Sequence, residues 1–170
     1  MKTKRAASEL ELRAAEALKV LLGQVSAIKL KGMKKRESQG SRHAAEILAH
    51  IDVYGHSHTL ACEVKAEADP LNLRDVLKEL RQSAAHFDRH ATPVLIAPYL
   101  SPEAQALCKE SHAAFLDLEG NARIAIGEVF IGKRTFAHRH TQPSALAAQA
   151  GFAPHSVSTS RDSAGTVAVA

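Results

Sequence analysis

Three side chains between positions 48 and 66 have the types and the spacing that metal-assisted chemistry requires. Asp52 and Glu63 each lie in an apolar run typical of a strand, and Lys65 follows Glu63 by two positions. Carboxylate oxygens suit Mg²⁺ or Mn²⁺ better than zinc. Such an ion lowers the pKa of a bound water, and a neighbouring ammonium stabilises negative charge that develops during a reaction. The pattern therefore predicts a hydrolytic site, provided that the three side chains project from one face.

A β-hairpin can bring the two carboxylates together. Period-2 alternation divides each run into an apolar half and a polar half, and Asp52, Glu63 and Lys65 all belong to the polar halves. A two-residue loop at 56–57 pairs Asp52 with Ala61 and puts both apolar halves on one face. In that register Asp52 and Glu63 are diagonal neighbours, with backbones roughly 7–8 Å apart.

An Asp followed about ten residues later by Glu-x-Lys on a hairpin resembles the motif of the PD-(D/E)XK restriction-endonuclease-like superfamily. The matching residues are Asp52, Glu63 and Lys65, and Ile51 stands where the family frequently has Pro. The resemblance implies a magnesium-dependent nuclease that cleaves DNA without a small-molecule cofactor. Asp52, Glu63 and the Val64 carbonyl would hold Mg²⁺ or Mn²⁺, and Lys65 would position or deprotonate the attacking water. Relatives that cut both strands usually pair, so a homodimer is a further expectation.

The resemblance also singles out two supporting residues. Some relatives use an early helical Glu as an extra metal ligand, a role open to Glu16 or Glu9. Exonuclease-like relatives carry a Gln followed four residues later by Tyr, and Gln82 matches that Gln although His86 replaces the Tyr. The alternative for each of these side chains is an ordinary surface position.

The elements along the chain agree with the same family. Apolar spacing predicts helices over 8–22 and 70–90 and after Ser101-Pro102, and strands over 24–30, 92–97, 113–118 and 124–131, besides the hairpin. Asp69 followed by Pro70 is a typical helix start. The resulting order α-β-β-β-α-β-α-β is the superfamily's core order. We therefore expect an α/β fold, a restriction-endonuclease-like core with a mixed central sheet.

The composition of the chain indicates its general class. The chain has 170 residues, 45% of them hydrophobic and 24% charged, as in a soluble globular protein. We expect a nuclease-like α/β domain over 1–135 and a tail over 136–170 that is either a degenerate helix-turn-helix or disordered. An apolar membrane span and a secretory signal are both missing from the sequence, which predicts a cytoplasmic protein without a membrane partner. The two cysteines then read as reduced thiols.

Positive charge is concentrated near the start of the chain. Residues 1–43 contain 11 Lys and Arg against 4 Asp and Glu, whereas residues 44–125 contain 7 against 12. A basic loop before the hairpin is expected to contact DNA phosphates. Its candidate phosphate-binding residues are Lys31, Lys34, Lys35, Arg36 and Arg42. The alternative is a solvated basic surface that binds nothing.

A second resemblance leads to a different function. The stretches that begin at Val94 and Asp117 are similar to bacterial abortive-infection-type antitoxins or regulators, in which a nuclease-like domain precedes a winged helix-turn-helix. Residues 144–157 have helix-turn-helix spacing, although no wing follows. The alternative function is thus a DNA-binding regulator that does not cleave. In a third interpretation, Glu63 and Lys65 form only a surface ion pair.

Overall fold

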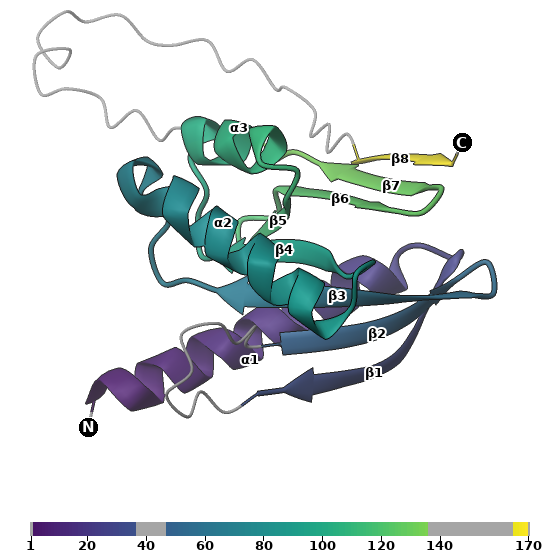
Figure 1. The fold of residues 1–170 in the computed structure, drawn as a ribbon, viewed down its shortest axis with the longest axis horizontal. Helices are drawn as coiled ribbons and strands as arrows, with labels where there is room; N and C mark the ends of the chain where they lie inside the picture. The colour runs from purple at the N-terminus through teal and green to yellow at the C-terminus, as the bar shows by residue number, and fades with distance from the viewer. Residues whose placement is uncertain (1, 37–46, 136–164, 170) are drawn as a thin grey trace, which may run out of the picture.

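The computed structural model describes residues 2–36, 47–135 and 165–169, which form three α-helices and one eight-stranded sheet (Figure 1). The elements in chain order are α1 (Lys2–Gly23), β1 (Ile28–Lys35), β2 (Ile47–Val53), β3 (His56–Val64), α2 (Pro70–Phe87), β4 (Thr92–Ala97), α3 (Pro102–Glu110), β5 (Ala114–Asp117), β6 (Ala122–Ile126), β7 (Val129–Lys133) and β8 (Gly165–Val169). From α1 to β5 this is the predicted order α-β-β-β-α-β-α-β, which is thereby confirmed.

The strands lie side by side in the order of the sequence, from β1 to β8. The strands β1, β2 and β3 pair antiparallel, β4 and β5 join parallel to β3, and β6, β7 and β8 pair antiparallel again. Helices α2 and α3 make the crossovers that parallel pairing requires. The sheet is therefore mixed, as expected for the restriction-endonuclease-like α/β class.

Helices cover the two faces of the sheet unequally. On one face α1 packs with Leu18 and Leu22 over a core that includes Ile51, Leu60 and Ile124. On the other face α2 and α3 lie next to each other over the parallel strands and bury a second core (Figure 1). We call this second face the α2/α3 side. On this side α2 lies against β3 and β4, and α3 lies against β5.

The predicted starts of helices α2 and α3 are confirmed. The Asp69 carboxylate accepts a hydrogen bond from the Leu71 N–H at 3.0 Å, and Pro70 opens α2. The Ser101 hydroxyl accepts from the Ala104 N–H at 3.1 Å and begins α3 in the same way. These contacts satisfy helix donors that lack an intrahelical partner. Strand β4 has the bounds predicted for it.

Three predicted elements were wrong in their bounds. Helix α1 begins at Lys2 and not at Ser8. Strand β1 runs to Lys35, so that the stretch expected as a basic loop is largely strand. The single strand expected over 124–131 is a hairpin, β6–β7, because Gly127 adopts a φ of 55° at its turn.

The tail contributes one strand to the described structure. Strand β8 pairs antiparallel with β7, with Val129 opposite Val169. The stretch over 144–157 that has helix-turn-helix spacing lies outside the described residues, and the boundary at 135–136 stays a prediction. None of the helices in the described part of the chain is long and apolar enough to cross a membrane.

Candidate functional site

The β2–β3 hairpin turns at Tyr54-Gly55 and not at the predicted loop over 56–57. Both turn residues have positive φ, 50° and 86°, as two-residue hairpin loops require. Asp52 consequently lies opposite Ser57, and Ala61 lies opposite Leu48. The predicted pairing of Asp52 with Ala61 is therefore wrong.

This register separates the carboxylates that were expected to share a metal ion. Ser57, the partner of Asp52, and Glu63 are six residues apart on β3, which corresponds to about 20 Å. Mg²⁺ binds oxygen ligands at roughly 2.0–2.1 Å. Asp52 and Glu63 cannot both reach such an ion, so the predicted ligand set of Asp52, Glu63 and the Val64 carbonyl does not fit magnesium. Among the described residues no cluster of three His, Cys, Asp or Glu side chains could hold a metal ion.

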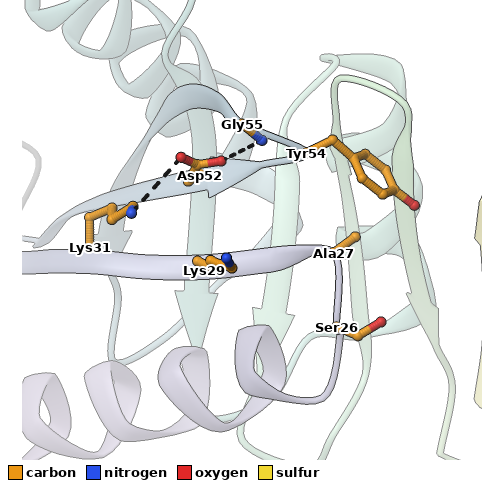
Figure 2. A pocket seen from close by; sticks show the side chains of 7 residues that line it. All are labelled: Ser26, Ala27, Lys29, Lys31, Asp52, Tyr54 and Gly55. Carbon is orange, nitrogen blue, oxygen red and sulfur yellow. Dashed lines mark hydrogen bonds and ion pairs between the residues drawn. The ribbon is translucent and has the colours of Figure 1, made fainter.

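Asp52 instead organises the end of the hairpin. Its Oδ1 accepts a hydrogen bond from the Gly55 N–H at 2.7 Å, and its Oδ2 lies 4.0 Å from the Lys31 ammonium (Figure 2). These side chains, with Lys29, line an open cavity of about 400 Å³ beside the turn. Asp52 is thus a turn-capping residue within a basic surface.

Glu63 and Lys65 remain together at the carboxyl end of β3. The Lys65 ammonium lies 2.6 Å from Glu63 Oε1, and the two side chains are 38% and 18% exposed, respectively. Lys65 also lines a small cavity with Glu67 and Asp69, next to the start of α2. The side chain of Val64, between them in sequence, is buried on the α1 side. A partly exposed Glu–Lys pair therefore sits where ligands commonly bind to α/β sheets.

Strand β1 carries lysines on the α2/α3 side of the sheet. Lys29 lies opposite Asp52, and Lys34 lies opposite Leu48, which packs against Ala84 of α2. Directly opposed residues share a face. Lys31 lies at a break in the register and also reaches Asp52. These three lysines are exposed on the edge strand.

The remaining predicted phosphate contacts have other surroundings. Lys35 points to the α1 side, where its ammonium lies 2.5 Å from Glu11. The Arg36 guanidinium stacks on the Phe87 ring of α2, at 5.3 Å from the ring centre. Arg42 lies outside the described residues.

The two supporting residues are not brought to Glu63 and Lys65. Glu16 is exposed on α1, and its neighbours Ala14 and Leu18 pack on the opposite face of the sheet. Gln82 is exposed on α2, two residues after the buried Leu80.

The cysteines are unsuited to nucleophilic chemistry. Burial raises the pKa of both the Cys62 and the Cys108 thiol from 9.0 to about 12. Both thiols are therefore neutral at physiological pH, and their side chains are part of the two cores.

Sequence reasoning missed a second polar surface on the α2/α3 side, beyond α3. Arg123 on β6 and Phe130 and Arg134 on or after β7 alternate with residues of the α1-side core. Tyr99, which follows β4, is 56% exposed. With Lys109 of α3, these residues line two adjoining cavities of about 800 and 190 Å³. The signal was the Gly127-Glu128 turn, which divides the predicted single strand in two and gives each half a polar face.

Comparison with known proteins adds little to this geometry. No protein-family model matches the chain, and no curated protein matches it in sequence. Among solved structures, the apo form of EndoMS superposes with a TM-score of 0.35 and 18% sequence identity. The superposition covers 62% of this chain and 45% of the EndoMS chain, less than half of that protein's length. A TM-score this low carries no argument about function.

Proposed function

We propose that the protein binds DNA through its sugar–phosphate backbone, along the α2/α3 side of β1. The observation that carries the proposal is the placement of Lys29, Lys31 and Lys34 on one exposed face of an edge strand. The described residues bring one carboxylate, that of Asp52, against this face, 4.0 Å from the Lys31 ammonium. The surplus of positive charge suits a polyanion, whose counterions are released when lysines replace them.

The alternative explanation of these lysines is protection of the strand edge. Lysines on an edge strand discourage pairing with a second chain. That role requires charge near the exposed backbone of β1, but it does not require the lysines to bind DNA in a salt-dependent way. Measurement of DNA affinity against salt concentration therefore separates the two explanations.

The first prediction concerns a triple variant, Lys29→Gln, Lys31→Gln and Lys34→Gln. Fluorescence anisotropy with a labelled duplex should show roughly tenfold weaker binding at low salt. The slope of log affinity against log salt should become shallower by about one for each lysine that contacts a phosphate. Lys78→Gln, an exposed lysine on α2, is the matched control and should change neither quantity. Equal affinity and slope in the triple variant and wild type would reject the proposal.

Phosphodiester cleavage is the second candidate function, and the Glu63–Lys65 pair favours it. The carboxylate could accept a proton from an attacking water, and the ammonium could stabilise charge on the phosphate. The support is a contact of 2.6 Å at the carboxyl end of β3, in a part of the surface that solvent reaches. Magnesium or manganese stays a prediction, and no step is assigned to it because the expected ligand set does not come together. A homodimer and a regulatory role without cleavage likewise stay predictions.

A further inference from the structure

The α2/α3 side of the sheet has a second open region, between α3 and the β6–β7 hairpin. Its two cavities, of about 800 and 190 Å³, share Gln105, Lys109 and Arg134, and together we call them the α3 trough. The larger cavity lies next to the carboxyl ends of β4 and β5, where ligands bind in open α/β sheets. Its volume is within the range of small-molecule sites, about 300–1,000 Å³.

Aromatic and cationic side chains both line the α3 trough. The Arg123 guanidinium lies 5.5 Å from the centre of the Phe130 ring. That ring also lies against Gly132, because a Cβ at this glycine would come within 2.9 Å of it. The ring thus contacts both a guanidinium and bare backbone, and Phe130 is still 36% exposed. Tyr99, which lines the larger cavity, is 56% exposed.

The charge of the α3 trough is positive. Lys109, Arg123 and Arg134 line it with a single carboxylate, that of Glu119. The ammonium of Lys133, which also borders the smaller cavity, is directed instead to Gln24 of the α1–β1 connection at 3.2 Å. Three cations against one carboxylate favour an anionic ligand over a neutral one.

The wall of the α3 trough is held rigidly by a buried carboxylate. Asp117 is 1% exposed and accepts hydrogen bonds at 2.8 Å from both the backbone N–H and the side-chain amide of Asn121. The side-chain oxygen of Asn121, Oδ1, in turn accepts a hydrogen bond from the Thr135 N–H at 2.9 Å, next to Arg134. A site formed on such a network is preorganised, which lowers the entropic cost of binding.

From this combination we infer that the α3 trough binds an unpaired strand of nucleic acid. Tyr99 and the Phe130–Arg123 stack offer surfaces for successive bases, and Lys109 and Arg134 face the backbone between them. Proteins that bind single strands combine a basic groove with aromatic stacking platforms in this way. A paired duplex hides its base faces and could not use the rings. The inference shares only the class of ligand with the proposed function, because different residues carry it.

Tyrosine emission gives a direct test of stacking. The chain has two tyrosines and no tryptophan, so in a Tyr54→Phe variant all tyrosine emission comes from Tyr99. Titration of this full-length variant with oligothymidylate should quench the emission in step with the rise in anisotropy of the labelled oligonucleotide. Saturable binding without quenching would overturn the inference. Oligouridylate in a parallel titration distinguishes RNA from DNA, and quenching by either supports the site.

Affinity measurements on variants then show which residues contribute to oligothymidylate binding. Tyr99→Ala should weaken oligothymidylate binding at least about fivefold, the loss expected for one stacked base. Arg134→Gln should make its salt dependence shallower, and Gly132→Ala should weaken binding severalfold because the Phe130 ring must move. Leu71→Ala, an apolar side chain 88% exposed on α2, and Lys78→Gln are the controls. Thermal unfolding of each variant shows that the fold is kept.

Two further outcomes separate this inference from the proposed function. The Lys29, Lys31 and Lys34 triple variant should keep its affinity for oligothymidylate, and Tyr99→Ala should keep its affinity for duplex. A protein that binds duplex but not oligothymidylate would overturn the inference and leave the proposed function standing. Displacement of the oligonucleotide by polyglutamate at equal charge concentration would also overturn it, since an acidic peptide has no bases to stack.

Discussion

Strands β1 and β7 lie towards opposite ends of the same sheet, and each leaves its α2/α3 side open beside a helix. On this side of β1 the polar groups are lysines, and the Lys31 ammonium lies 4.0 Å from the Asp52 carboxylate. Around β7 the cations lie next to rings, with the Arg123 guanidinium 5.5 Å from the Phe130 ring centre. A phosphate backbone needs only the first kind of surface, whereas exposed bases need the second.

The difference has a physical origin in the hairpin turn next to each surface. The β2–β3 hairpin turns tightly at Gly55, and Asp52 accepts from the N–H of that residue at 2.7 Å, so a carboxylate is fixed within the basic face. The β6–β7 hairpin turns at Gly127 and brings Arg123 opposite Gly132, which leaves room for a ring between the strands' polar side chains. Turn position thus decides which side chains lie opposite each other on each surface.

The largest expected effect concerns the third region, the Glu63–Lys65 pair between these two surfaces. If the chain nicks plasmid DNA, Glu63→Gln and Lys65→Met should each slow nicking by at least about 100-fold, the usual contribution of a proton-transferring group. Asp52→Asn should leave the rate within about twofold, because Asp52 and Glu63 are about 20 Å apart. The measurement is the loss of supercoiled plasmid with time, in magnesium and in a chelator. Loss of nicking in Asp52→Asn but not in Glu63→Gln would refute the assignment.

Two variants complete that experiment. Glu79→Gln, on the exposed face of α2, is the matched control for charge. Glu46 precedes Ile47 in the sequence and lies outside the described residues, and Ile47 is the partner of Cys62, next to Glu63. Glu46→Gln therefore tests whether a second carboxylate needed for cleavage comes from that stretch. Absence of nicking in the wild-type protein would leave DNA binding as the function.

Several parts of the fold were predictable because their signals are local. Asp69-Pro70 and Ser101-Pro102 specify helix starts by side-chain capping, and the short apolar run over 92–97 is typical of a buried parallel strand. The order of elements followed from these signals. Neither the length of β1 nor the turn at Gly127 could be read from apolar spacing, because both depend on which neighbouring strand is available for pairing.

The alternation of apolar and polar residues could not predict the register of the β2–β3 hairpin. Moving the turn from 56–57 to Tyr54-Gly55 changes which residues are opposed but keeps every side chain on its face, since side chains alternate with a period of two. The apolar pattern excludes a one-residue slip only. The deciding signal is Gly55, whose φ of 86° suits the second position of a two-residue loop. Because the register sets the separation of Asp52 and Glu63, the turn at Tyr54-Gly55 places the two carboxylates too far apart for the predicted metal site.

A smaller effect distinguishes the two roles of Asp52 directly. Asp52→Asn removes a negative charge 4.0 Å from the Lys31 ammonium and keeps an acceptor for the Gly55 N–H. Duplex affinity should therefore rise about twofold, since an exposed ion pair is worth roughly 0.2–1 kcal/mol. If Asp52 were a metal ligand, Asp52→Asn would instead lower the duplex affinity in magnesium.

Asp52→Ala should in addition lower the free energy of unfolding by about 1 kcal/mol, because the acceptor for the Gly55 N–H is lost. Chemical denaturation measures this cost.

The smallest expected effect compares local stability under the two surfaces. Cys62 lies in the central strand β3 and Cys108 in the nine-residue helix α3 beside the trough, and burial raises the pKa of each thiol from 9.0 to about 12. A folded-state pKa above the unfolded one means that this contribution to stability is full below pH 9 and is lost as the pH rises towards 12. Iodoacetamide should therefore modify both thiols slowly at pH 8 and rapidly in denaturant.

The two thiols can be compared one at a time in Cys62→Ala and Cys108→Ala variants, with modification followed by mass spectrometry. Cys108 should react faster than Cys62, because a short helix near an open surface unfolds locally at lower cost than a central strand. Faster reaction at Cys62 would mean that the β1–β3 region opens first, and that the trough is the more rigid of the two surfaces.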